Sequence, residues 1–266
     1  MTAAEEKLRA GDLAGCLQEL QAEIRRKPAE SKPRIFLAQL LMVLGEWDRA
    51  ITQLTVVGEM DASAIPMTRA YGSAIQCERL RASIFKGERS PLIFGDPEPW
   101  IALVVQALAA VAAGRTAQAD EIRAQAYETA PAIAGTLNGT DFEWIADADS
   151  RLGPVLEVLL NGAYYWVPFQ RIAAIRFETP SDLRDLVWLP AQFTWANGGE
   201  AMGFIPTRYA GSESDADSGV RLARKTEWTP IGSDAFAGRG QRVLATSADE
   251  VPLLEVRELL LRLPGS

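Results

Sequence analysis

The side chains that most often carry catalysis are scarce in this sequence. It contains no histidine, so the commonest general base and the commonest metal ligand are both missing. The same absence excludes Ser-His-Asp and Cys-His catalysis. The two cysteines, Cys16 and Cys77, lie far apart and neither belongs to a C-x-x-C pair, which argues against zinc, redox and disulfide sites. Because Cys16 falls within an apolar helical stripe, we predict a buried, inert thiol there.

Acidic residues come closest to a catalytic or metal-binding cluster at Glu143, Asp147 and Asp149. Three carboxylates are able to bind a cation or to act as an acid and a base. A calcium loop that starts at Asp147 needs glycine at its sixth position and glutamate at its twelfth, where this chain has leucine and valine. We therefore predict no metal site and no catalytic residue. We interpret Asp149 or Ser150 as the cap of a helix over residues 152–160.

The aromatic run Tyr164-Tyr165-Trp166 has the composition of a stacking platform for bases or sugars. The net charge of the chain is −8, however, so packing of these rings in a core is the preferred interpretation. The chain has no G-x-x-x-x-G-K-[ST] motif, and no G-x-G-x-x-G lies between an expected strand and an expected helix. We predict no cofactor.

The positive charges form no basic surface of the kind that binds nucleic acid or membranes. The clusters at residues 25–27 and 221–225 are short, and each lies close to acidic residues. Residues 1–9 lack the apolar core of a signal peptide. The longest apolar stretch, residues 101–113, is too short to span a bilayer. We expect a cytoplasmic protein that neither binds nucleic acid nor inserts into a membrane.

The elements that position these residues begin with an internal repeat. Gly11-Asp12-Leu13 recurs as Gly45-Glu46-Trp47 after 34 residues, the period of the tetratricopeptide helical hairpin, and a weaker copy starts at Gly114. The glycine ends the first helix of each pair, and a small residue five positions later allows two helices to approach closely. We predict a tetratricopeptide-like helical domain over residues 1–134. A generic helical bundle is the alternative.

One expected helix of this domain, residues 35–44, is apolar almost all round. Such a helix is either buried on every side or offers its second face to a partner. In repeats of this kind the first helix of each pair lines the concave surface. Phe36, Gln39 and Val43 share one face, and we predict that they bind a partner there. Burial of the three under the expected helix over residues 66–85 is the alternative.

The second half has a different character and carries five of the seven tryptophans. Apolar runs at residues 186–195 and 201–209 flank Asn197-Gly198-Gly199, a strong hairpin signal. Pro190 and Pro206 predict that these strands lie at an edge or carry bulges. We further expect a hairpin over residues 240–256, a short helix over 255–263 and a mobile polar loop over 212–219. The fold class is therefore α+β, with a β-rich mixed domain over residues 135–266.

Several segments, some of them long and rich in tryptophan, together carry a resemblance that covers nearly the whole chain. They are residues 9–13, 34–37, 44–50, 95–100, 142–154, 164–169, 179–188, 193–200 and 205–209. These segments resemble the ImpE/TagJ family. The resemblance implies an accessory component of a bacterial type VI secretion system. It also implies a cytoplasmic location, association with the small contractile-sheath subunit TssB, and a link to the ClpV recycling machinery. It brings no catalytic residues.

Two functional classes remain open. The first is a non-catalytic adaptor that binds a helix of the sheath subunit on the repeat domain. The second is an enzyme or a small-ligand-binding protein that uses the tryptophan-rich half. The missing histidines and motifs favour the adaptor. A pocket in the second half, lined by converging polar side chains, would favour the other class.

Overall fold

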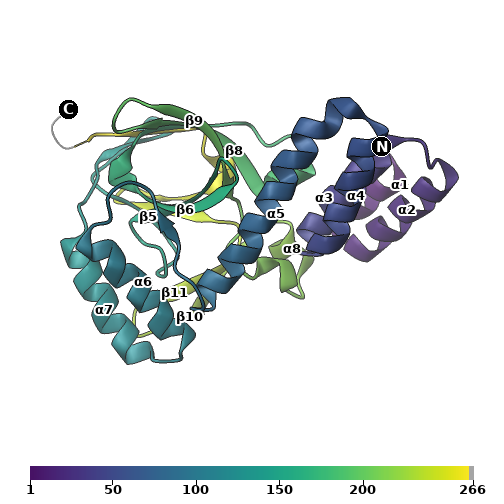
Figure 1. Ribbon diagram of the computed structural model, residues 1–266. Coiled ribbons are helices and arrows are strands. Elements are labelled where there is room, and N and C mark those ends of the chain that lie inside the picture. The colour runs from purple at the N-terminus through teal and green to yellow at the C-terminus, as the bar shows by residue number, and fades with distance from the viewer. Residues whose placement is uncertain (264–266) are drawn as a thin grey trace.

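The structure, a computed structural model, describes residues 1–263 and has the predicted α+β fold. Helices build the N-terminal part, and strands build most of the C-terminal part (Figure 1). The helices of the first part are α1 (Ala3–Arg9), α2 (Leu13–Arg26), α3 (Ser31–Val43), α4 (Trp47–Met60), α5 (Ile65–Phe85), α6 (Pro99–Ala112) and α7 (Thr116–Thr129), with a 3-10 turn η1 (Ala62–Ala64) before α5. The change from helix to strand falls after α7. The division into separate domains at residues 134 and 135 stays a prediction.

The glycines of the repeat have the backbone conformation that the pattern requires. Gly11, Gly45 and Gly114 have φ angles of 78°, 69° and 71°, in the left-handed region where a side chain is disfavoured. The small residues five positions later have no exposed surface; they are Cys16, Ala50 and Ala119. In Figure 1, α1 to α4 stack at one end of the molecule and the long α5 runs from them towards the sheet. Helices α6 and α7 form a second stack beside the sheet.

The main sheet has nine strands and curves into a barrel-like wall (Figure 1). In spatial order its strands are β1 (Leu92–Ile93), β6 (Ala163–Pro168), β5 (Val155–Leu160), β9 (Glu200–Pro206), β8 (Trp188–Trp195), β7 (Ile172–Phe177), β14 (Glu258–Leu261), β2 (Gly135–Leu137) and β3 (Thr140–Phe142). Two smaller sheets lie against it. One contains β13 (Glu250–Pro252), β12 (Val243–Thr246) and β4 (Ile145–Asp147), and the other is the hairpin of β10 (Thr226–Pro230) and β11 (Phe236–Gly240).

Two helices expected in the second half are strands. Residues 155–160 form β5, so the prediction of a helix over residues 152–160 is wrong. Leu156 and Val158 point into the core inside the curved sheet, whereas Val155 and Leu159 join the core on the helical side. A strand buried on both faces is apolar on both, here except for Glu157, and over so short a run its sequence resembles that of a helix. The helix expected over residues 255–263 is also wrong, because a 3-10 turn η5 (Leu253–Glu255) and strand β14 occupy this segment.

The predicted hairpins are confirmed. Strands β8 and β9 flank the Asn-Gly-Gly turn, and β12 and β13 form the second hairpin. Of the two alternatives predicted from Pro190 and Pro206, the edge position is wrong, since β8 and β9 both lie inside the sheet. The ladder of β8 with β7 has an irregularity between Ile172 and Ala174, away from both prolines. The carbonyl of Pro190 accepts a hydrogen bond from Glu178, which follows the last residue of β7. Pro190 lacks the N–H that would return this bond, and because Glu178 lies just past the end of β7, the missing bond falls at the end of the ladder. Pro206 is itself the last residue of its strand.

The helical and β-rich parts share one apolar core. Strand β1, between α5 and α6, pairs with β6 as a parallel edge of the main sheet. The ring of Trp188 on β8 stacks on Trp47 of α4 at 6.2 Å and also contacts Tyr71 of α5. The residues buried together on this side come mainly from α1 to α7 and from the strands β5, β6 and β8. This packing fixes the orientation of the helical stack against the sheet.

Arginines from the second half bind the carboxyl ends of α1 and α3 at equivalent positions of the repeat. Arg224 donates to the carbonyls of Leu8 and Arg9 at 2.9 and 3.0 Å, and Arg208 donates to those of Met42 and Val43 at 3.3 and 2.8 Å. The two pairs of carbonyls are 34 residues apart, one repeat period. A cation at a helix carboxyl end satisfies unpaired carbonyls and is favoured by the helix dipole. The β-rich part therefore caps the carboxyl end of the first helix in both repeats.

Between these two arginines, residues 212–219 were expected to be a mobile polar loop. Instead the segment forms η4 (Ser212–Ser214) and the short helix α8 (Ser218–Arg221), which lie against the helical stack. A side chain added at Gly45 would meet Glu213, and one added at Gly11 would meet Ser218. Ser212 is fully buried, and its hydroxyl donates to the carbonyl of Tyr209. The prediction of a solvated loop over residues 212–219 is therefore wrong at its beginning.

A buried ionic network ties α5 to the centre of the sheet. Glu157 of β5 is fully buried and accepts hydrogen bonds from Arg81 of α5 at 2.6 and 2.9 Å, from Arg242 and from the hydroxyl of Tyr164. Burial alone would raise the pKa of Glu157, but Arg81 and Arg242 outweigh it and lower the pKa to about 2. Arg242 also pairs with the buried Asp147. Glu157 is therefore a charged bridge between a helix and two parts of the β-rich region.

We predict that Glu157→Gln strongly destabilises the protein. The substitution leaves Arg81 and Arg242 buried without their shared counter-charge, and breaking a buried ion pair in this way costs about 3–5 kcal/mol. The measurement is the free energy of unfolding in urea. Glu258→Gln is the matched control, because the Glu258–Arg176 pair is exposed and such pairs contribute about 0–1 kcal/mol. Equal losses for the two variants would contradict the bridging role of Glu157.

Candidate protein-binding grooves

The buried acidic residues of the second half are engaged in structural pairs, whereas Glu143, the third member of the predicted cluster, is exposed. Asp149 is fully buried, pairs with Arg151, and accepts hydrogen bonds from the backbone N–H groups of Arg151 and Gly238. It caps no helix, so the predicted cap before residue 152 is wrong. Asp147 is paired with Arg242. Within residues 1–263, no group of histidine, cysteine and acidic side chains is placed to hold a metal ion.

The aromatic run belongs to the core. Tyr164 and Trp166 have no exposed surface, and the indole N–H of Trp166 donates to the Tyr164 hydroxyl at 2.8 Å. Their preferred interpretation as core residues is confirmed. A hollow of about 260 Å³ lies between α5 and the sheet, and Asn161 is the polar side chain that the second half contributes to it. This hollow therefore lacks the converging polar groups that a small-ligand site in the second half would need.

Helix α3 crosses the stack with a groove on each of two sides. It is apolar almost all round, as its sequence shows, and residues 37–43 are buried. Of the predicted partner-binding residues, Phe36 is half-buried, Gln39 is 6% exposed and Val43 is fully buried. Gln39 lies against the hydroxyl of Tyr71 on α5, the helix that the alternative interpretation named. Contact of these residues with a partner stays a prediction, and Val43 has no surface to offer it in this structure.

The first groove is acidic and contains two of the predicted residues. It has a volume of about 440 Å³. Phe36, Ile35 and Leu20 contribute apolar surface, and Gln39 lies beside them. Four carboxylates and one lysine surround this surface; they are Glu5, Glu23, Glu30, Asp182 and Lys32. Asp182 comes from the β-rich part, so the second half supplies one wall. We name this the Phe36 groove.

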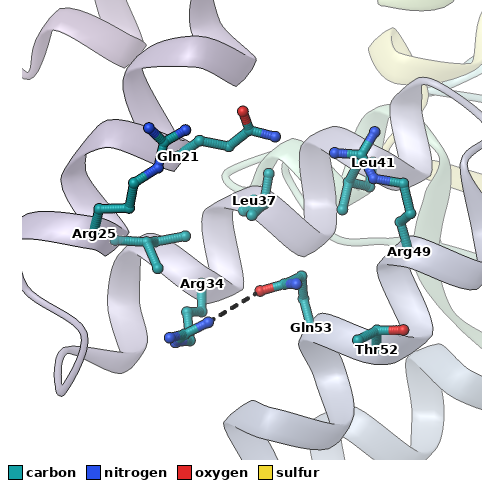
Figure 2. A pocket seen from close by; sticks show the side chains of 9 residues that line it. Gln21, Arg25, Arg34, Leu37, Leu41, Arg49, Thr52 and Gln53 are labelled. Atoms are coloured by element: carbon teal, nitrogen blue, oxygen red, sulfur yellow. Dashed lines mark hydrogen bonds between the residues drawn. The ribbon is translucent and has the colours of Figure 1, made fainter.

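The second groove is basic and was not predicted. It has a volume of about 390 Å³ and is lined by Gln21, Ile24, Arg25, Arg34, Leu37, Leu41, Arg49, Thr52 and Gln53. Figure 2 shows Arg25, Arg34 and Arg49 around Leu37 and Leu41, with Arg34 directed at Gln53. We name this the arginine groove. Its arginines come from three helices and are 9 and 15 residues apart. The sequence showed only a short basic cluster at a helix end, and no motif links the three.

Three comparisons with known proteins point to the same family or the same fold, two of them over nearly the whole chain. The model of the ImpE protein family matches residues 139–260. The Type VI secretion system accessory component TagJ of Pseudomonas aeruginosa is 49% identical over 256 residues, which are 96% of this chain and 90% of that protein. The crystal structure of protein VPA1032 from Vibrio parahaemolyticus has the same fold. Its TM-score is 0.90 at 23% identity, and the match covers 99% of both chains.

We predict that both thiols are unreactive in the folded protein. Cys16 has no exposed surface and Cys77 is 4% exposed, so the prediction of a buried thiol at Cys16 is confirmed. Burial raises the pKa of each thiol to about 11, so little thiolate forms near neutral pH. Labelling with a thiol reagent should be slow in buffer and complete in denaturant. Fast labelling of either cysteine under native conditions would show that its helix opens locally.

Proposed function

The chain belongs to the ImpE family, and from this premise we propose that it is an accessory adaptor of a type VI secretion system. The Pseudomonas aeruginosa protein that is similar to nearly the whole chain is a type VI secretion system accessory component. Its direct partner is the sheath subunit TssB, as the family resemblance implies. Through that subunit it acts in ClpV-dependent handling of the sheath. The cytoplasm is the compartment that these partners imply.

The groove beside α3 carries the proposal that the adaptor binds a helix. An amphipathic helix bound in such a groove places apolar anchors against an apolar floor and polar groups against its rim. The Phe36 groove offers this arrangement, with Phe36 half-buried and four carboxylates around it. Its net negative charge fits a helix with basic residues beside its anchors. The rim therefore favours one partner chemistry as well as one shape.

The adaptor is proposed to be non-catalytic. Glu157, Asp147 and Asp149 are the carboxylates most withdrawn from water in the β-rich part, and each is paired with arginine. A general base has to be able to reach a substrate proton. These three carboxylates instead fix the packing of strands and helices. Within the described part of the chain, no helix has the length and apolar character of a membrane span.

We predict that Phe36→Glu weakens binding of purified TssB without unfolding the protein. The substitution removes an apolar anchor and adds a charge to an already acidic rim. A buried anchor of this size accounts for about ten- to a hundredfold in affinity. Isothermal titration calorimetry measures the affinity, and circular dichroism checks the fold. Val43→Asp is unsuitable here, because Val43 is fully buried and a buried charge would destabilise the helical stack.

Met60→Glu is the matched control for Phe36→Glu. Met60 ends α4, is 37% exposed and lies outside the residues that line the Phe36 groove. This control adds the same negative charge to the same helical stack, so it should bind TssB as the wild type does. Full-strength binding by Phe36→Glu would rule out this groove as the site.

A further inference from the structure

We propose that the arginine groove is a second binding surface, and that its occupant is an acidic amphipathic helix of a partner protein. This surface lies on the opposite side of α3 from the residues proposed above, and its chemistry is reversed. The proposal therefore goes beyond the adaptor function and does not depend on TssB being the partner in the Phe36 groove.

Three helices each present one face to this groove. Gln21, Ile24 and Arg25 of α2 are spaced by three and one, so they lie on one side of that helix. Helix α3 contributes Arg34, Leu37 and Leu41, and α4 contributes Arg49, Thr52 and Gln53, with the same kind of spacing. In Figure 2 the leucines of α3 form the floor and the long polar side chains stand around it. A floor of apolar side chains with a polar rim is the surface that an amphipathic helix recognises.

The charge of the groove specifies the helix that fits. Three of its nine lining side chains are arginines and none is acidic, although the chain as a whole has a net charge of −8. A basic groove on an acidic protein attracts acidic segments selectively. Arginine binds carboxylates through two parallel N–H···O bonds, which gives direction as well as attraction. Glutamates or aspartates beside the apolar anchors of a helix would meet this rim.

The arginines are poorly satisfied within the chain itself. The Nε of Arg34 is buried and has no hydrogen-bond partner among the described residues, and its Nη1 is 3.4 Å from the amide oxygen of Gln53. A buried unpaired donor is costly, and a carboxylate from outside would satisfy it. Arg25 forms no ion pair within residues 1–263, whereas Arg49 pairs with Glu46, the N-cap residue of its own helix. Two of the three guanidinium groups are therefore free to pair with a partner.

The apolar floor distinguishes binding of an acidic helix from binding of a free anion. Inorganic phosphate would use the guanidinium groups and leave the partly exposed side chain of Ile24 uncovered, whereas Leu37 and Leu41 are already buried and form only the base of the groove. An acidic helix uses both parts of the surface, because its anchors cover the floor and its carboxylates meet the rim. The opposite charges of the two grooves also give them different partners. One molecule is then able to hold a basic helix and an acidic helix on the two sides of α3.

Binding of a designed probe peptide to the full chain tests this inference. The acidic probe is a blocked helical peptide of about 15 residues, with leucines at i and i+4 on one face and glutamates beside them. Its counterpart carries lysine in place of each glutamate. Fluorescence anisotropy of the labelled acidic probe should show saturable binding that weakens with salt. The lysine probe should not compete for this site. Inorganic phosphate should compete poorly, because it cannot cover the floor.

Two neighbouring arginines give a matched pair of variants. Arg25 lines the groove and Arg26 does not, yet both are exposed near the end of α2. Arg25→Glu should weaken binding of the acidic probe by about tenfold, as expected for loss of a charge-assisted pair. Arg26→Glu changes the net charge equally and should have little effect. Arg49→Glu, on the opposite wall, should weaken binding less than Arg25→Glu, because Arg49 is already paired with Glu46.

Three outcomes would overturn the proposal. Equal weakening by Arg25→Glu and Arg26→Glu would show general electrostatic attraction and not a site. Full competition by inorganic phosphate would show an anion site without a helix. No binding of the acidic probe at concentrations up to about 1 mM would show that the surface is not a helix groove of useful affinity.

Discussion

Glu157 is a carboxylate without solvent contact that Arg81 and Arg242 share. Arg81 belongs to α5, the last helix packed on the N-terminal stack. Arg242 is the residue just before β12, a strand of the three-stranded sheet. Taking three charges out of water is costly, so the arrangement is stable only when all of them meet in one geometry. That geometry exists only when α5 lies across β5. Arg81 also donates to the carbonyl of Arg208 at 2.8 Å, which joins the network to the segment that covers the repeat.

The shape of the helical stack follows from this attachment. Arg208 and Arg224 bind the carboxyl ends of α3 and α1, so the β-rich part holds the first helix of both repeats at equivalent points. An isolated repeat array leaves such helix ends to water or to a capping repeat. Here the described residues of the second half cover them and leave only the two grooves beside α3 open. The grooves that we propose as binding surfaces are the parts of the stack that the chain does not cover itself.

The features that the sequence predicted correctly are those that short motifs determine. The 34-residue period, the left-handed glycines and the Asn-Gly-Gly hairpin depend on neighbouring residues, and each is confirmed. Strand β5 was mistaken for a helix because a short apolar run fits both, and only its burial on two faces distinguishes them. The network could not be predicted, since Arg81 and Glu157 are 76 residues apart. The arginine groove was missed for the same reason, because its side chains converge only after three helices have packed.

Hydrogen exchange of the complex with purified TssB tests the adaptor account most directly. The account places the partner on the helical stack, so binding should slow exchange in α3 and in the helices beside it. Residues 135–263 should exchange as they do in the free protein, apart from the segment around Asp182 that borders the Phe36 groove. Protection confined to the β-rich part, with α2, α3 and α4 unchanged, would contradict the account and move the binding surface to the sheet.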